Sequence, residues 1–171
     1  MWWDSDRILN GGSGYWDAPI FFPEQSTFAF SEPQPATMIV APVVWLTGSP
    51  TAGYNTYLVL SLLLNGAITW IILRRNGAPT FHAMLGAVMM IWLPVSLRQF
   101  EVLQLIPVWP LLWTWDAVRR HGKSPTWRTT LETAVAFSFC VYSSIHHALF
   151  LSVALAATGW IFMKQPGSRR F

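Results

Sequence analysis

Long apolar stretches alternate with short polar or basic stretches from residue 49 to the end of the sequence. The apolar runs cover residues 51–73, 80–97, 102–118 and 129–163. A helix needs roughly 20 apolar residues to cross the hydrocarbon core of a bilayer, so the first run is long enough to span a membrane. The last run is longer than a single tilted helix uses, and its polar interruption at residues 142–147 divides it into two short spans. The pattern therefore predicts an all-α integral membrane protein with about five membrane helices.

The sequence before the first long run has a different character. Residues 14–33 mix aromatic side chains with three prolines, which disfavour a long helix or a central strand. The same segment carries three carboxylates, Asp17, Glu24 and Glu32. Aromatic rings favour the membrane interface and carboxylates favour water. We therefore expect residues 1–33 to form an acidic, aromatic loop outside the cytoplasm.

A short apolar run follows this loop and leads into the first span. Pro42 interrupts the run, which is too short to cross a bilayer. We expect an interfacial helix at residues 34–48, a helical transmembrane domain at residues 49–165 and a cytoplasmic tail at residues 166–171.

Composition supports the membrane assignment. Hydrophobic residues make up 53% of the chain and charged residues 11%, whereas soluble domains usually have about 25% charged residues. The 11 tryptophans fit a chain with much interfacial surface. The single cysteine, Cys140, excludes an internal disulfide and a thiolate metal site, and the net charge of +3 gives no reason to expect a nucleic-acid partner. Membrane lipid is the partner that the composition predicts.

Basic residues fall at alternate helix ends, which gives the expected orientation. They form three groups, namely Arg74 and Arg75, then Arg119, Arg120, Lys123 and Arg128, then Lys164, Arg169 and Arg170. The positive-inside rule places all three groups on the cytoplasmic side. Residues 1–50, 98–101 and 143–147 are then extracytoplasmic.

Titratable side chains gather on the predicted outer side. Arg98 and Glu101 lie where two proline-containing spans meet, and His146 and His147 lie in the polar break of the last run. Ionisable groups beside an acidic, aromatic loop are what a site for a charged, lipid-borne substrate needs. Two alternatives remain open, namely interfacial charges that are merely solvated and an i, i+3 ion pair between Arg98 and Glu101.

Other polar residues favour different explanations. Asn65 lies in the middle of the first span, where an amide more often joins helices than binds a substrate. His82 and His121 lie toward the cytoplasmic ends and residues 146–147 toward the opposite end, which disfavours a haem held between histidines. The sequence contains no glycine-rich phosphate loop, zinc-ligand spacing or nucleophile elbow.

A series of motifs occupies the first 120 residues. The motifs are YWDAPIFFP at residues 15–23, FAFSE at 28–32, AGYN at 52–55 and QLIPVWPL at 104–111. The series resembles the first extracytoplasmic loop and following helices of bacterial polytopic GT-C-type glycosyltransferases, over residues 14–120. In that family a further helix and an acidic motif precede the loop. The resemblance therefore implies an N-terminally truncated or partial version, with Asp4 and Asp6 as a remnant of the acidic motif.

The resemblance implies transfer of a sugar from a polyprenyl-phosphate donor at the outer face of the bacterial plasma membrane. Glu32 or Asp17 would be the general base, and a divalent metal ion remains open as a cofactor. Arg98 would hold the donor phosphate, because a guanidinium is always charged and offers a planar set of donors. The other expected substrate contacts are Glu101, His146, His147, Tyr54 and Asn55.

Two functions from different classes remain open. One is a GT-C-like glycosyltransferase, whole or partial, that uses a polyprenyl-phosphate sugar. The other is a non-catalytic membrane subunit that docks on a membrane-protein partner through its aromatic helices and loop. Because the family's leading helix and acidic motif are missing from the sequence, we expect little transferase activity from this chain alone.

Overall fold

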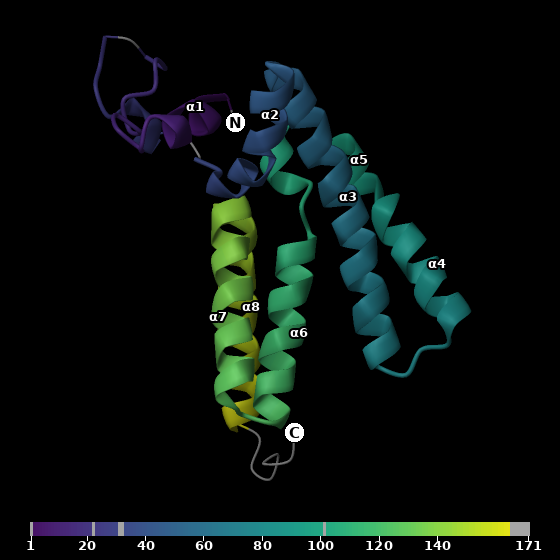
Figure 1. The fold of residues 1–171 in the computed structure, drawn as a ribbon. Helices are drawn as coiled ribbons and strands as arrows, with labels where there is room; N and C mark the ends of the chain where they lie inside the picture. The colour runs from purple at the N-terminus through teal and green to yellow at the C-terminus, as the bar shows by residue number, and fades with distance from the viewer. Residues whose placement is uncertain (1, 22, 31–32, 101, 165–171) are drawn as a thin grey trace. The chain divides into compact units, whose positions relative to one another are not determined.

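The computed structural model of the protein describes residues 2–21, 23–30, 33–100 and 102–164 (Figure 1). Within these residues it contains helices and no strand, so the predicted all-α fold is confirmed. In chain order the elements are α1 (Trp2–Leu9), η1 (Thr27–Phe30), η2 (Pro35–Val40), α2 (Ala41–Thr47), α3 (Pro50–Arg75), α4 (Thr80–Ile91), α5 (Pro94–Arg98), η3 (Leu103–Leu105), α6 (Trp109–Lys123), α7 (Trp127–Ser143) and α8 (Ile145–Lys164). The η elements are short 3₁₀ helices.

The chain divides into two compact units, Met1–Leu62 and Leu63–Phe171. The boundary falls inside α3, so this helix contributes its first half to one unit and its second half to the other. Each unit has its own buried carboxylate, Asp4 in the first and Asp116 in the second.

In the first unit, Asp4 lies on α1 and is almost fully buried. The Tyr15 hydroxyl donates a hydrogen bond to its carboxylate at 2.9 Å, and the Thr37 hydroxyl lies at 3.4 Å. Burial and the neighbouring carboxylate raise the pKa of the Tyr15 phenol above its usual value. The Trp45 indole of α2 donates to a backbone carbonyl of α1 at 3.1 Å. The predicted loop at residues 1–33 therefore begins with a helix that packs against α2.

The first long apolar run forms α3, close to its predicted limits. The Ser49 hydroxyl accepts the Ala52 N–H at 3.2 Å, and Pro50 occupies the first helical position, where a missing N–H leaves nothing unpaired. With 26 residues, α3 is about 39 Å long. Among the described residues it is the one helix that is long and apolar enough to cross a membrane. The membrane arrangement with five helices stays a prediction.

The second apolar run is interrupted before its predicted end. α4 ends at Ile91, and Leu93 adopts an extended backbone with ψ 120°. A residue that precedes a proline disfavours the helical conformation, so Pro94 stops α4 and begins the short α5. Residues 80–97 thus form two helices rather than one.

Two glycines allow α3 and α4 to pack closely in the second unit. A Cβ atom added at Gly66 would lie 2.7 Å from Cδ1 of Ile91 and 3.2 Å from the carbonyl oxygen of Ala87. A Cβ atom added at Gly86 would lie 2.5 Å from Cδ1 of Leu73. The hairpin of these two helices therefore requires the absence of side chains at both positions.

The third apolar run becomes helical later than predicted, at Trp109. Pro107 and Pro110 interrupt the backbone hydrogen bonds that an earlier helix would need. Asn65 of α3 satisfies two of the groups left over, because its amide nitrogen donates to the Ile106 carbonyl at 2.9 Å and its amide oxygen accepts the Trp109 N–H at 2.8 Å. Asn65 is fully buried. Its expected role as a helix-packing amide is confirmed.

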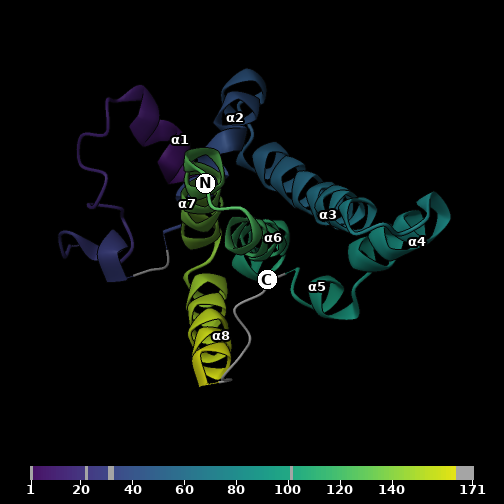
Figure 2. The same cartoon turned by 90° about the horizontal axis from the view of Figure 1, so that it is seen from below.

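The last apolar run breaks inside the predicted stretch 142–147. Ser144 has an extended backbone and separates α7 from α8. α7 lies beside α6, and α8 contacts both (Figures 1 and 2). Cys140, Ala148 and Leu151 form the buried centre of this group of three helices.

The Gly66→Val substitution tests the close approach of α3 and α4. We expect it to lower the free energy of unfolding by about 1–3 kcal/mol, because the added methyl groups overlap Ile91 and the Ala87 carbonyl. The measurement is equilibrium unfolding of the purified protein.

The matched control is Ala67→Val, at the next and exposed position of α3. Helix propensity alone predicts the opposite order, because valine is a better helix former than glycine and a poorer one than alanine. A smaller loss of stability in Gly66→Val than in Ala67→Val would contradict the packing described.

Candidate functional site

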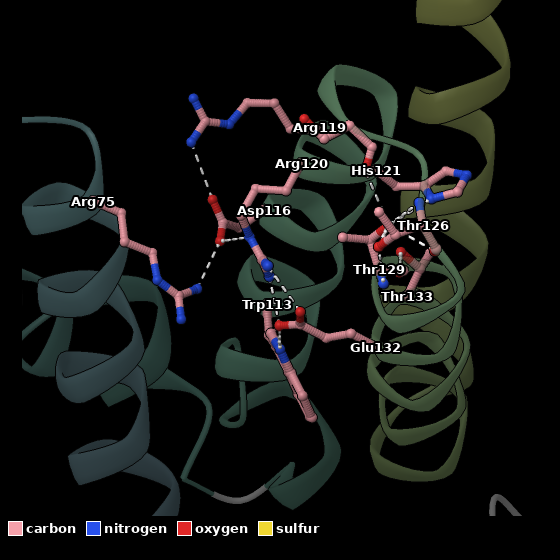
Figure 3. A network of polar contacts seen from close by, with 11 residues as sticks. Arg75, Trp113, Asp116, Arg119, Arg120, His121, Thr126, Thr129, Glu132 and Thr133 are labelled. Atoms are coloured by element: carbon pink, nitrogen blue, oxygen red, sulfur yellow. Dashed lines mark hydrogen bonds and ion pairs between the residues drawn. The ribbon is translucent and has the colours of Figure 1, made fainter.

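A network of charged side chains in the second unit centres on Asp116 of α6 (Figure 3). The Asp116 side chain is 1% exposed, yet three guanidinium groups reach it. Arg75 Nη1 donates to Oδ2 at 3.1 Å, Arg119 Nη2 donates to Oδ1 at 3.1 Å, and Arg120 Nε donates to Oδ2 at 2.9 Å. A buried carboxylate without such partners would be strongly destabilising.

Helix geometry and two helix ends bring these groups together. Asp116, Arg119 and Arg120 have i, i+3 and i, i+4 spacing, which places their side chains on one face of α6. Arg75 is the last residue of α3. Arg119 also donates to the side-chain oxygen of Asn76, which follows α3, at 2.5 Å. The C-terminal ends of α3 and α6 therefore meet at one carboxylate.

Arg120 extends the network to α7. Its Nη1 and Nη2 atoms donate to the two carboxylate oxygens of Glu132, at 2.8 and 2.5 Å. This bidentate hydrogen bond to Glu132, together with the hydrogen bond to Asp116, raises the pKa of the Arg120 guanidinium above its usual range. The Trp113 indole donates to Glu132 at 3.0 Å. The pair thus joins the last turn of α6 to the beginning of α7.

The connection between α6 and α7 is also held by side chains. His121 Nδ1 and the Thr129 hydroxyl oxygen lie 3.0 Å apart. Thr126 caps α7, because its hydroxyl accepts the Thr129 N–H at 3.2 Å and its own N–H donates to the Thr129 hydroxyl at 3.0 Å. The short link between the two basic helix ends therefore has a defined conformation.

The chemistry available at this network is electrostatic rather than acid–base. Both oxygens of Asp116 already accept hydrogen bonds from guanidinium groups, so the carboxylate is poorly placed to take a proton from a substrate. Three cations face two carboxylates, which leaves the network with a net positive charge. In the part of the chain that the structure describes, no group of three His, Cys, Asp or Glu side chains could hold a metal ion.

Three of the predicted site residues that the structure describes lie in the first unit. Asp17 is exposed, and its Oδ1 accepts the Ser26 N–H at 2.9 Å in a turn where Ser26 has a φ of 57°. Tyr54 and Asn55 lie near the start of α3, with Tyr54 half-buried and Asn55 exposed. Glu32, the other predicted general base, lies outside the described residues.

Arg98, His146 and His147 belong to the second unit. Arg98 ends α5 with an exposed side chain, and it forms no ion pair with any described carboxylate. Its predicted neighbour Glu101 lies outside the described residues. His146 is exposed, and the His147 N–H donates to the Ser144 hydroxyl at 3.3 Å, at the start of α8. The predicted substrate groups are thus divided between two units, and their proximity stays a prediction.

The Asp116 network was not predicted from the sequence. The arginines were assigned to membrane topology, and Asp116 and Glu132 had no predicted role. One signal was present, because an acidic residue followed by arginines at i+3 and i+4 is the spacing of ion pairs on a helix. The contribution of Arg75 had no such signal, since it depends on how α3 packs against α6.

Asp116→Asn tests the role of the buried carboxylate. We expect the free energy of unfolding to fall by about 1.5–3 kcal/mol, because the three guanidinium groups lose their charged acceptor. Equilibrium unfolding of the purified variant gives the value.

Glu132→Gln is the comparison variant. We expect a smaller loss, because Glu132 is partly exposed and Arg120 keeps its contact with Asp116. A larger loss in Glu132→Gln than in Asp116→Asn would show that Asp116 is not the centre of the network.

Comparison of the chain with family models, with curated proteins and with solved structures found no match.

Proposed function

We propose that the protein is a polytopic membrane protein, with the basic ends of α3 and α6 on the cytoplasmic side. The observation that carries this proposal is the distribution of side chains on the helices. α4 exposes Phe81, Met84, Leu85, Val88 and Met89, with exposed fractions between 46 and 68%. On α7 and α8 the exposed apolar residues include Leu131, Val135, Leu149, Phe150 and Val153. Continuous apolar surface of this kind is unfavourable in water and favourable in lipid.

The interior of the second unit has the opposite composition. Its buried residues are mostly small or polar and include Asn65, Ser96, Thr114, Ser143, Ala83, Ala117, Ala136 and Ala148. Lipid provides no hydrophobic driving force between helices, so small residues and polar contacts hold membrane helices together. In addition, only 22% of the most apolar part of α3 is buried inside the protein, which supports a position of α3 in lipid.

In this setting we propose transfer of a sugar from a polyprenyl-phosphate donor at the extracytoplasmic face. The resemblance of residues 14–120 to GT-C-type enzymes supports this function. Arg98 supports it as well, because an exposed guanidinium without a described counter-charge can bind a phosphate. Glu32 or Asp17 would act as the general base. The remaining substrate contacts in this proposal are Glu101, His146, His147, Tyr54 and Asn55.

A non-catalytic membrane subunit is the second candidate, and the contact of Asp17 favours it. The carboxylate of Asp17 accepts the Ser26 N–H and so stabilises a turn, which is a structural use of a proposed catalytic group. The exposed apolar faces of α4 and α7 would then contact the helices of a partner protein as well as lipid.

Labelling of single cysteines tests the membrane topology. In a Cys140→Ser background, we place one cysteine at Gln25 or at Ser124, both of which are exposed. An impermeant thiol reagent added to intact cells should label the cysteine at position 25 only, because the basic helix ends are cytoplasmic. The measured quantity is the labelled fraction of each variant before and after the cells are opened. Labelling of position 124 alone in intact cells would reverse the proposed orientation.

Arg98→Gln tests the phosphate contact of the proposed reaction. We expect binding of a polyprenyl-phosphate sugar to the purified protein to weaken at least about tenfold, since a hydrogen-bonded charge pair is lost. The matched control is Arg128→Gln, another exposed arginine, which stacks on Trp127 near the opposite end of the helices. That control should bind like the unmodified protein.

The same measurements separate the two candidate functions. Specific binding that depends on Arg98, with sugar transfer that Asp17→Asn or Glu32→Gln abolishes, supports the transferase. Absence of binding and turnover in the full chain, together with co-purification of a second membrane protein, supports the subunit.

A further inference from the structure

We propose that Arg75 and Arg119 form a binding site for the phosphodiester headgroup of an anionic phospholipid, at the end of the helices opposite to Arg98 in the proposed topology. Asp116 lies between the two guanidinium groups and accepts one hydrogen bond from each. In Figure 3, both arginines reach Asp116 on the side turned away from Glu132. The buried carboxylate therefore acts as a positioning residue that holds two cations together.

Both arginines retain donors for a ligand. A guanidinium has five N–H groups. With the described residues, Arg75 makes one hydrogen bond, to Asp116, and Arg119 makes two, to Asp116 and Asn76. Their side chains are 48% and 35% exposed, whereas the Asp116 side chain is 1% exposed. A phosphate that approaches from outside thus meets N–H groups before it meets the carboxylate.

The local charge favours an anion. Asp116 and Glu132 are the two described carboxylates of the second unit, and both are engaged with arginines. Arg74 and Lys123 add further positive charge at the same helix ends. Guanidinium groups match phosphate oxygens in pairs of parallel hydrogen bonds, which makes a pair of arginines on one carboxylate a suitable phosphate contact.

Two tryptophans indicate that the ligand is a lipid headgroup. Trp115 lies one helical turn before Arg119 on α6, and Trp70 lies about one turn before Arg75 on α3. Their exposed fractions are 42% and 41%. Exposed indoles mark the depth of the headgroups at a membrane surface, so the two arginines reach the level of the lipid phosphates.

This inference rests on the proposed membrane placement but is independent of glycosyl transfer. The experiment uses the full chain, purified in a zwitterionic detergent and mixed with equal amounts of phosphatidylglycerol and phosphatidylcholine. Native mass spectrometry then counts the lipids that each protein molecule retains. We expect the unmodified protein to retain phosphatidylglycerol in preference, and Arg75→Gln to reduce its affinity about tenfold.

Arg74→Gln is the matched control, because it removes the same charge from the neighbouring position, where the guanidinium donates to the Ala78 carbonyl. Arg75→Gln leaves Asp116 with Arg119 and Arg120, and its melting temperature shows whether the fold is kept. Arg75→Lys keeps the charge without the planar donors and should give an intermediate affinity. Equal losses in Arg74→Gln and Arg75→Gln would overturn the proposal in favour of diffuse charge attraction.

A second arm distinguishes the source of the phosphate. Inorganic phosphate, titrated into the same protein without lipid, should bind much more weakly than phosphatidylglycerol, because it gains nothing from the exposed apolar surface nearby. Binding of inorganic phosphate that depends on Arg75, with no preference for phosphatidylglycerol over phosphatidylcholine, would reject a lipid as the ligand. Unchanged phosphatidylglycerol retention in folded Arg75→Gln would reject the site altogether.

Discussion

The ion pairs of Asp116 are the constraint on which the second unit depends. Burial of a carboxylate is tolerated only when cations or hydrogen-bond donors replace the lost water. Here the donors come from the end of α3 and from α6. Arg120 also donates to Glu132 of α7 and so links α6 to α7. Asp116 and Glu132 together thus link three helix ends through Arg75 and Arg120. The surrounding arginines keep a net positive charge at that end, which is the basis for the proposed phosphate site.

A second constraint is the satisfaction of backbone groups where prolines interrupt the helices. The chain meets it with side chains from other elements, and Asn65 is the clearest case because it bonds on both sides of the break before α6. The Ser144 hydroxyl serves the first turn of α8 in a similar way. Buried backbone groups such as these would otherwise remain without partners, so polar residues inside apolar runs are structural requirements.

Periodicity and composition predicted the helical content of the chain well. They predicted the specific contacts between side chains less well. The start of α3 and the break between α7 and α8 could be predicted, because a Ser-Pro pair and a polar interruption act locally. The late start of α6 could not be predicted, since the sequence does not show how many residues around Pro107 and Pro110 lose the helical conformation. The candidate site shows the same limit. Arg119 and Arg120 pair with Asp116 by spacing along one helix, whereas Arg75 joins them only through tertiary packing.

The separation of the partners along the chain has a consequence for the order of folding during synthesis. Arg120 and Glu132 are 12 residues apart, so the α6–α7 hairpin can close its ion pair as soon as α7 has been made. Arg75 and Asp116 are 41 residues apart, and α3 is made long before its counter-charge exists. Closing the longer loop costs more chain entropy, and the hairpin lowers that cost by presenting Asp116 already oriented by Arg119 and Arg120. We therefore expect the α6–α7 hairpin to form before the end of α3 docks onto Asp116.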